Sequence, residues 1–516
     1  MDKIWKEKIN DLKKRKEKVS EAGGGKRIAR QHAAGKLTAR ERLEALFDND
    51  TFVELDDMIT SRSLDFGMDK KRKPGDGVIT GYGKIHGRLA FASSQDFTVS
   101  GGSLGEAHAM KICRAMDKAF EMRVPFISIN DSGGARIEEG IDGLAGYGDI
   151  FYRNTRASGI IPQISVIMGP CAGGACYSPA ICDFIFMTET TSQMYITGPS
   201  VVKSVTGEEI SASDLGGSSV HGTSSGVSHF VYKNDLDCLN GVRKLLGYLP
   251  QNNDDKPLVV AGHEIDYCAR LTDIVPGDPQ KAYDVRKVIA TFTDENTFME
   301  VQAEFARNIV VGFARICGKV IGIVANQSAY MAGSLEINAS DKAARFIRFC
   351  DAFNIPLLTL VDVPAFLPGS QQEHAGIIRH GAKMLFAYSE ATVPKVSVIM
   401  RKAYGGAYIA MNSKGLGADI VYAWPIAEIA VMGAAGAVSI IGRNAIKNAE
   451  NPSEKKKELL NEYNSKFMNP YIAAEHGYID EVILPEETKI KLVSAFETLA
   501  EKKQVLPYKK HGNIPL

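Results

Sequence analysis

Four glycine-containing turns are the segments of this sequence best suited to chemistry. They are Gly133-Gly134-Ala135 and Gly173-Gly174 in the first half, and Pro368-Gly369 and Gly405-Gly406-Ala407 in the second. A glycine turn that opens a helix leaves main-chain N–H groups without intrahelical acceptors, and such groups can hold a phosphate or an oxyanion. Glycine also permits tight packing of a helix on a strand. The turns alone therefore leave a binding role and a packing role open.

Side chains offer weaker candidates. The segment 222–226 fits G-x-S-x-G, but its flanks are polar, whereas a nucleophile elbow needs a buried strand before the serine. The segment 109–112, AMKI, resembles a biotin-attachment sequence, yet it lies in a run with helical periodicity, so we expect Lys111 to be a surface lysine of a helix. We likewise expect Glu138 and Glu139 to lie on a solvated helix face. A serine hydrolase is therefore a minor alternative.

The turns alternate with segments typical of buried strands and helices, which predicts an α/β fold. A capping box at Thr38 and Glu41 predicts that a helix begins there. The other expected elements of the first half are a charged helix over 2–20, β structure over 75–91, a helix from about 103 to 122, and buried strands over 125–130 and 163–168.

The two halves of the chain repeat. Asp131 matches Asp362, Ser165 matches Ser397 and Gly198 matches Gly433, all at a nearly constant offset along the sequence. The polar, proline-bounded segment 250–257 lies between the halves and is the best linker. The sequence therefore predicts two similar domains, 1–255 and 256–516, each with its own pair of turns.

Composition excludes several classes of protein. Among 516 residues, 61 Lys and Arg balance 61 Asp and Glu, which argues against nucleic-acid binding. No stretch approaches the ~18 apolar residues of a membrane span, and residues 1–25 lack the apolar core of a signal peptide. The eight cysteines form no C-x-x-C pair or zinc pattern, so we expect buried, reduced thiols, no metal site and a cytoplasmic location.

Six long motifs run through the chain in order. They are GDGVITGYG (75–83), QDFTVSGGSLGEAH (95–108), INDSGGARIEEG (129–140), IPQISVIMGPCAGGACYSPA (161–180), SQMYITGP (192–199) and RKAYGGAYIAM (401–411). With these motifs the sequence resembles the carboxyltransferase subunits of biotin-dependent acyl-CoA enzymes. That family includes the β subunit of propionyl-CoA carboxylase, the α subunit of methylmalonyl-CoA decarboxylase and the large subunit of transcarboxylase. The resemblance covers nearly the whole chain.

The resemblance implies two tandem crotonase-like (ClpP/crotonase) β-β-α spiral domains. It also implies a homo-hexamer, a dimer of trimers, whose active sites lie between the first half of one subunit and the second half of another. Acyl-CoA would bind the first half and carrier-bound biotin the second. The chain would then need a biotin carboxyl carrier protein, together with either a membrane decarboxylase subunit or a biotin carboxylase subunit. Any membrane association would come through those partners.

By the same resemblance, specific residues receive roles. The N–H groups of Gly173 and Gly174 would hold the thioester oxygen, and those of Gly406 and Ala407 the ureido oxygen of biotin. Gly133, Gly134 and Ala135 would line the CoA side, with Gly369 and Gly405 in the turns of the biotin half. Ile409 replaces an acidic residue that some family members carry, and this position bears on acyl-chain selection. A weaker candidate for the CoA phosphates is the basic set Lys26, Arg27, Arg30 and Lys36.

The function that follows is carboxyl transfer between methylmalonyl-CoA, with propionyl-CoA as its product, and carrier-bound biotin. The best match within the family is the decarboxylase α subunit. The alternatives are a propionyl-CoA or acetyl-CoA carboxylase β subunit and a non-catalytic CoA-binding scaffold. The biotin nitrogen can exchange the proton itself, which is consistent with the lack of an obvious side-chain base in the sequence.

Overall fold

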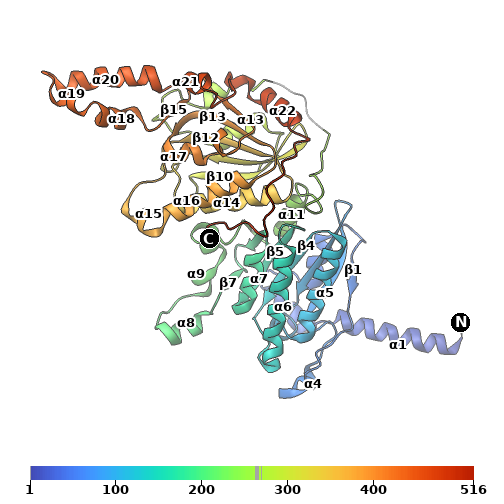
Figure 1. Ribbon diagram of the computed structural model, residues 1–516. Helices are drawn as coiled ribbons and strands as arrows, with labels where there is room; N and C mark the ends of the chain where they lie inside the picture. The colour runs from blue at the N-terminus through green and yellow to red at the C-terminus, as the bar shows by residue number, and fades with distance from the viewer. Residues whose placement is uncertain (1, 262–266, 269) are drawn as a thin grey trace. The chain divides into compact units, whose positions relative to one another are not determined.

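The chain forms two compact units, unit 1 (Met1–Asp255) and unit 2 (Lys256–Leu516), in a computed structural model (Figure 1). The structure describes residues 2–261, 267, 268 and 270–516. The boundary falls inside the polar segment 250–257. Each unit is an α/β body with its own sheet and is described by itself.

Unit 1 is built on an eight-stranded sheet. The first three strands pair antiparallel and the remaining ones parallel, in the order β1-β2-β3-β4-β5-β6-β8, while β7 pairs with the end of β5. The strands are β1 Val53–Leu55, β2 Val78–Ile85, β3 Arg88–Gln95, β4 Phe126–Ser132, β5 Gln163–Ala172, β6 Phe184–Thr188, β7 Gln193–Tyr195 and β8 Phe230–Tyr232.

Unit 2 repeats this topology strand for strand. Its order is β9-β10-β11-β12-β13-β14-β16, with β15 paired to the end of β13. The strands are β9 Met299–Val301, β10 Ile309–Ile316, β11 Lys319–Asn326, β12 Leu357–Val363, β13 Lys395–Tyr404, β14 Ile420–Ala423, β15 Glu428–Ala430 and β16 Glu481–Val482. The predicted structural repeat is therefore present in the fold.

Helices cover the sheets. In unit 1 they are α1 Lys3–Ser20, α2 Gly25–Ala33, α3 Ala39–Leu46, α4 Met68–Lys71, α5 Glu106–Met122, α6 Ile141–Ala157, α7 Tyr177–Ile181, α8 Pro199–Thr206, α9 Ala212–Gly216, α10 Ser218–Thr223 and α11 Asp235–Leu246. In unit 2 they are α12 Leu271–Ile274, α13 Val285–Phe292, α14 Ile337–Ala352, α15 Ser370–Ala375, α16 Ile377–Glu390, α17 Gly405–Ala410, α18 Ala434–Ile441, α19 Arg443–Lys447, α20 Pro452–Phe467, α21 Tyr471–Glu475 and α22 Thr488–Thr498.

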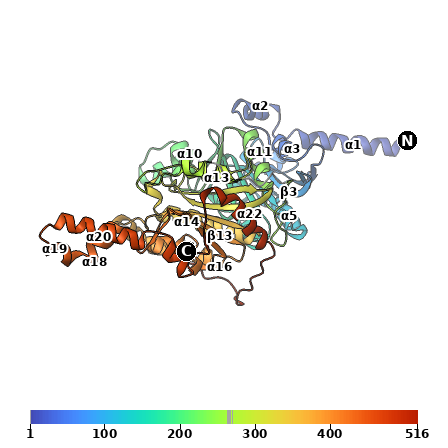
Figure 2. The ribbon, with the colours of Figure 1, turned by 90° about the horizontal axis from the view of Figure 1, so that it is seen from above.

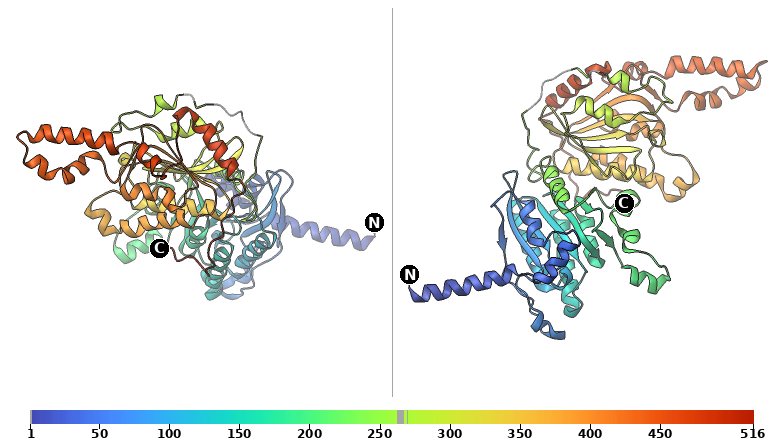
Figure 3. Two further views of the ribbon diagram at one scale, coloured as in Figure 1. Left: turned by 45° about the horizontal axis from the view of Figure 1, so that its top comes forward. Right: turned by 180° about the vertical axis from the view of Figure 1, so that it is seen from behind.

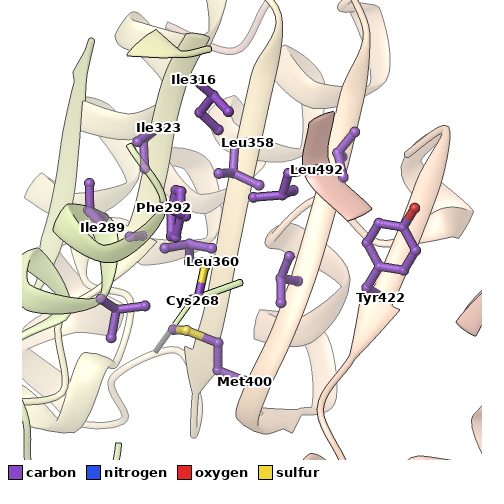
Figure 4. Packing of buried hydrophobic residues seen from close by; sticks show 14 of the residues in the cluster. Cys268, Ile289, Phe292, Ile316, Ile323, Leu358, Leu360, Met400, Tyr422 and Leu492 are labelled. Atoms are coloured by element: carbon purple, nitrogen blue, oxygen red, sulfur yellow. The ribbon is translucent and has the colours of Figure 1, made fainter. Parts of the chain in front are cut away.

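Buried strands and amphipathic helices make the cores. The central strands β5 and β13 are almost wholly buried, as expected for parallel strands covered on both faces. In unit 2, Ile289 and Phe292 of α13 pack with Leu358 and Leu360 of β12 in one apolar cluster, which also includes Leu492 of α22 (Figure 4). This packing fixes the sheet from which the second-half turn emerges.

Two local predictions near the N-terminus are confirmed. Helix α3 begins at the predicted capping box, with the Thr38 N–H 2.8 Å from Glu41 Oε2 and the Glu41 N–H 3.3 Å from Thr38 Oγ1. The charged helix α1 is present, has no buried residue and projects from the sheet of unit 1 (Figure 3). In unit 2, α18, α19 and α20 form a comparable projection (Figures 1 and 2).

The prediction that Lys111 is a surface lysine is wrong. Its side chain is fully buried, and its Nζ donates to the carbonyls of Gly75 and Val78 at 3.0 and 2.5 Å. Lys342, its counterpart in the second half, is buried in the same way and donates to the carbonyls of Gln302, Phe305 and Ile309 at 2.8–2.9 Å. The lysine of the AMKI segment is thus part of the repeated fold, which argues against biotin attachment there.

Candidate active site

The Gly173-Gly174 turn directly follows β5. Gly173 has φ +63°, a left-handed conformation that favours glycine, and opens a short 3₁₀ helix, Gly173–Cys176, that leads into α7. The first N–H groups of such a helix have no intrahelical acceptor. The sharp exit from the strand therefore leaves the Gly173 and Gly174 amides as the first donors of the turn.

The Gly133–Ala135 turn lies beside this one. A Cβ on Gly134 would lie 3.2 Å from the carbonyl oxygen of Ala172, and the φ of Gly134 is +103°. Two of its amides are used internally, because the Gly133 N–H donates to the Gly101 carbonyl (3.0 Å) and the Gly134 N–H to Ser132 Oγ (3.1 Å). Gly133 and Gly134 therefore contribute close backbone approach rather than free donors.

The corresponding turn of unit 2 follows β13. Gly405 has φ +56° and opens α17, so the N–H groups of Gly405, Gly406 and Ala407 precede the first intrahelical bond. A Cβ on Gly405 would lie 2.9 Å from the Val431 carbonyl oxygen, whereas one on Gly406 would meet no atom within 4 Å. Ile409, on the same helix, is 47% exposed. Four of the candidate residues of this half therefore share one short segment.

Gly369 is placed differently. It has φ +135° at the N-terminus of α15, where a Cβ would meet no atom within 4 Å. The structural counterpart of the first-half turn is another segment, because the bridge between Leu104 and Ala135 is repeated by one between Leu335 and Phe366. Gly369 is therefore not the equivalent of Gly133–Ala135, although both lie after corresponding strands.

In each unit a buried aspartate lies near the end of the strand that pairs with the central strand, and sequence reasoning missed its importance. Asp131 on β4 and Asp362 on β12 are fully buried. At each aspartate the register of the parallel pair shifts: Asn130 pairs with Ile167 and Ser132 with Cys171, and in unit 2 Val361 pairs with Ile399 and Val363 with Ala403. The signal was available, since the two aspartates are matched positions of the sequence repeat.

The expectation of a solvated face at residues 138 and 139 is wrong for Glu139. Its side chain is 4% exposed and pairs with Arg136 Nη1 at 2.7 Å, and Arg136 also pairs with Asp76 at 2.8 Å. Burial raises the pKa of Glu139, but hydrogen bonds from Ser61, the Glu106 N–H and Arg136 outweigh it and hold that pKa below its ordinary value. This charged cluster lies beside the Gly133–Ala135 turn and stabilises it.

The basic set proposed for the CoA phosphates is only partly exposed. Lys36 is buried, and its Nζ donates to Asp131 Oδ1 at 2.8 Å, so the prediction is wrong for this residue. Burial lowers the pKa of Lys36, and Asp131 partly opposes that shift. Arg27 donates to the Thr98 carbonyl at 2.9 Å, while Lys26 and Arg30 are exposed on α2.

The remaining chemical candidates are structural. Gly222 lies in the last turn of helix α10, which ends at Thr223, and Ser224 follows in a turn, so segment 222–226 does not have the strand–turn–helix form of a nucleophile elbow. All eight cysteines are free thiols, seven of them buried. Within the described ranges, no group of three or more His, Cys, Asp or Glu residues is arranged to hold a metal ion. None of the helices in those ranges is long and apolar enough to cross a bilayer.

Comparison with known proteins identifies the family to which a chain with these turns is similar. The family model of the carboxyl transferase domain matches residues 30–514. The chain is 56% identical over 512 residues to a methylmalonyl-CoA decarboxylase subunit alpha of Propionigenium modestum, and 54% identical over 512 residues to a propionyl-CoA carboxylase carboxyltransferase subunit of Haloferax mediterranei; each alignment covers 99% of both proteins.

A solved structure of a similar protein has the same fold. The crystal structure of a transcarboxylase 12S hexamer with methylmalonyl-CoA and methylmalonic acid bound superposes with a TM-score of 0.97 at 52% identity, covering 98% of each chain. This likeness confirms the predicted crotonase-like α/β fold. With two repeated sheets, a glycine turn at the end of each central strand and matches along its whole length, this chain belongs to the carboxyl transferase family, as an acyl-CoA carboxyltransferase.

Proposed function

We propose that this chain transfers a carboxyl group between methylmalonyl-CoA and carrier-bound biotin, with acyl-CoA on unit 1 and biotin on unit 2. The observation that carries the proposal is the repeated turn, in which Gly173-Gly174 and Gly405-Gly406-Ala407 present the first amides of a helix at the end of the same strand of each sheet. The names of the relatives, which include decarboxylase, carboxylase and transcarboxylase subunits, support the choice of substrate.

The chemistry requires two anion sites. The carbon–carbon bond to the carboxyl group of methylmalonyl-CoA breaks, leaving an enolate on the thioester, and the carboxyl carbon forms a bond to a ureido nitrogen of biotin. The proton that this nitrogen loses goes to the α-carbon of the enolate and gives propionyl-CoA. Negative charge thus develops on the thioester oxygen and on the ureido oxygen. Preorganised N–H donors at each oxygen lower the barrier, and removing one such donor typically costs about 10²–10³-fold in kcat.

In this proposal the Gly173 and Gly174 amides hold the thioester oxygen, and the Gly406 and Ala407 amides hold the ureido oxygen. Gly133, Gly134 and Ala135 shape the acyl-CoA side, Gly369 and Gly405 shape the biotin side, and the apolar Ile409 favours a short apolar acyl group. The two oxygens are held by main-chain N–H groups, so these roles need no ionisable side chain at the reacting atoms.

The proposed assembly is a cytoplasmic homo-hexamer that works with a biotin carboxyl carrier protein and a membrane decarboxylase subunit. The transcarboxylase 12S structure is described as a hexamer, which supports the assembly. The second candidate is a propionyl-CoA carboxylase β subunit, favoured by the 54% identity to the Haloferax protein. It would pair with a biotin carboxylase subunit instead of a membrane subunit.

The test uses the purified full chain with methylmalonyl-CoA and free biotin, and it follows propionyl-CoA. We expect turnover that depends on biotin, with malonyl-CoA as a comparison substrate. A reaction that does not depend on biotin, or no turnover with any short acyl-CoA, would contradict the proposal and favour a CoA-binding scaffold. Isolation of the native complex then separates the two candidates, because an ATP-dependent biotin carboxylase partner identifies a carboxylase and a multi-span membrane partner a decarboxylase.

A further inference from the structure

We infer that Arg42 and Arg401 are positioning residues for the two glycine turns, each acting through the aspartate at the neighbouring strand bulge. The inference rests on the proposed function, since it concerns where the turn amides lie. Neither arginine belongs to a glycine turn, and both are almost completely buried.

The bulge sets where each turn begins. Opposite the single residue Asp131, β5 carries three residues, 168–170, before pairing resumes at Cys171, two residues ahead of Gly173. Opposite Asp362, β13 carries residues 400–402 before pairing resumes at Ala403, two residues ahead of Gly405. A bulge re-aims the strand that contains it. The position of the turn amides therefore depends on what holds the bulge.

The main chain of each aspartate is held in the same way in both units. The Asp131 N–H donates to Gln95 Oε1 at 3.2 Å, and the Asp362 N–H donates to Asn326 Oδ1 at 3.1 Å. Gln95 and Asn326 are the last residues of β3 and β11. The aspartate backbone is thus fixed from one side by the preceding strand, which leaves the carboxylate to hold the bulge on the other side.

In unit 2, residues of the bulge itself bind the aspartate. Arg401, the central bulge residue, donates to Asp362 Oδ2 through Nε (3.1 Å) and Nη2 (2.8 Å), and the Lys402 N–H donates to Asp362 Oδ1 at 3.2 Å. Nη1 of Arg401 donates to three carbonyls, those of Pro276, Asp278 and Lys281, at 2.8–3.2 Å. One side chain therefore ties the bulge to the aspartate and to the segment before α13.

In unit 1 the same strand position cannot do this. Gly169 stands where Arg401 stands, and a Cβ there would lie 1.9 Å from Asp131 Oδ1; Pro170, which stands where Lys402 stands, has no N–H to donate. In unit 1 it is Arg42 of α3 that binds both the aspartate and the bulge. It donates to Asp131 Oδ2 (2.9 Å) and, through Nη2, to the carbonyl of the bulge residue Met168 (2.8 Å).

Three further contacts belong to the unit 1 cluster. Nε of Arg42 donates to Asp235 Oδ2 at 2.9 Å, and Lys36 Nζ donates to Asp131 Oδ1 at 2.8 Å. Gln31 Nε2 also donates to Asp131 Oδ2, at 3.0 Å. A guanidinium therefore spans the aspartate and the bulge in both units, although it comes from different places in the sequence. Removal of either arginine frees the bulge next to a buried carboxylate, which is a costly arrangement.

The test compares paired variants of the full chain in the biotin-dependent assay. For unit 2 these are Arg401→Met and the double variant Asp362→Leu/Arg401→Met, which removes both Asp362 and Arg401; for unit 1 it is Arg42→Met. The matched controls are Arg315→Met and Arg88→Met. These two arginines also donate to carbonyls, those of Leu258 and Leu249, but they lie at the hairpin end of each sheet, away from the bulges.

We expect each bulge variant to lower kcat at least tenfold while both KM values stay within about twofold, because the turn amides act in the transition state. The controls change the melting temperature without this loss. The double variant addresses misfolding, since replacing both members of a buried pair with apolar residues is often neutral for stability. A double variant that is folded and fully active overturns the inference.

A second readout separates the two turns. The probe is a nitro analogue of propionyl-CoA, whose nitronate mimics the enolate. Arg42→Met should weaken binding of the nitronate at least tenfold with little change for propionyl-CoA, whereas Arg401→Met should leave both unchanged. Equal effects of the two variants would contradict the assignment of one arginine to each turn. If the wild-type chain shows no biotin-dependent transfer, the proposed function itself fails, which is a distinguishable result.

Discussion

The two units reach the same backbone geometry with different side chains. Unit 2 neutralises its buried aspartate with Arg401 from the adjacent strand, whereas unit 1 uses Arg42 and Lys36 from the segment that precedes its sheet. The cation is 39 residues from the aspartate in unit 2 and 89 residues away in unit 1. Unit 1 therefore depends on its N-terminal segment in a way that unit 2 does not.

What the units share is main-chain geometry. Both have a bulge at the aspartate, a left-handed glycine at the turn and a buried lysine that binds carbonyl groups of an earlier loop. What differs is the set of charged side chains around these features, such as the Arg136–Glu139 pair, for which unit 2 has Leu367 and Ser370 at the matching positions. Retention of the backbone while side chains diverge is expected when amides carry the function.

The strongest test of this comparison removes one amide. Gly406→Pro deletes an N–H in the first turn of α17, where proline is tolerated, and a Cβ at Gly406 meets no atom within 4 Å. We expect kcat for biotin-dependent transfer to fall by about 10²–10³-fold, the usual cost of one oxyanion donor.

Its control is Gly406→Ala, which keeps the N–H and should stay within about twofold of wild-type activity. The same change in unit 1, Gly174→Ala, should be less well tolerated, because its Cβ would lie 3.1 Å from the Tyr147 ring. Proline and alanine variants of Gly406 with equal activity would show that this amide does not hold an oxyanion.

A smaller effect is expected from a substitution that crowds the buried aspartate of unit 1. Gly169→Ala places a Cβ 1.9 Å from Asp131 Oδ1 and 2.8 Å from Lys36 Nζ, so unit 1 should lose about 3 kcal/mol of stability, the upper end for overpacking. Calorimetry should show a melting temperature lower by about 6–12 °C.

The matched control for this change is Gly148→Ala on α6. A Cβ at Gly148 would meet no atom within 4 Å, so alanine should be neutral or slightly stabilising in a helix. If both variants melted like the wild type, the bulge of unit 1 would have to be loosely packed. The claim that position 169 has no room for a side chain, unlike position 401 in unit 2, would then be wrong.

Patterns within the chain predicted the repeat, the α/β class and the turns at Gly133, Gly173 and Gly405, whereas Gly369 lies outside the segment that corresponds to Gly133–Ala135. Strand–turn–helix order is local, and a nearly constant offset exposes duplication without knowledge of packing. The same patterns failed for charged side chains. Lys111 has the helical spacing of a surface residue, but its acceptors are the carbonyls of Gly75 and Val78, which belong to a distant, earlier part of the chain. Periodicity identifies a helix face and cannot identify what covers it.

A better use of the repeat would have recovered part of what was missed. Lys111 and Lys342 have the same separation along the chain as Asp131 and Asp362, so their joint presence already indicated a structural role. The link between Arg42 and Asp131 had no such signal, because Arg42 has no counterpart that performs its task in unit 2. Contacts that only one unit makes are the ones that a repeat cannot predict.

The last and smallest effect concerns these two lysines, for which burial lowers the pKa from its ordinary value of 10.5 to about 8 for Lys111 and about 7 for Lys342. Between the folded and unfolded pKa values the unfolded chain binds a proton that the native lysine does not. Unfolding then takes up a proton, so the free energy of unfolding rises with pH, by at most about 1.4 kcal/mol per pH unit for each lysine.

This contribution should begin near pH 7 for Lys342 and near pH 8 for Lys111, and it should end near pH 10.5 for both. Lys342→Met should therefore reduce the rise in stability between pH 7 and 8, whereas Lys111→Met should do so only above pH 8; urea unfolding at half-unit steps checks both, with the exposed Lys118→Met as control. Identical pH profiles for the two variants would mean that the two buried lysines have equivalent environments. Because Lys342 binds four carbonyls and Lys111 two, a lower onset for Lys342 would show that burial, rather than the number of acceptors, sets the difference between the units.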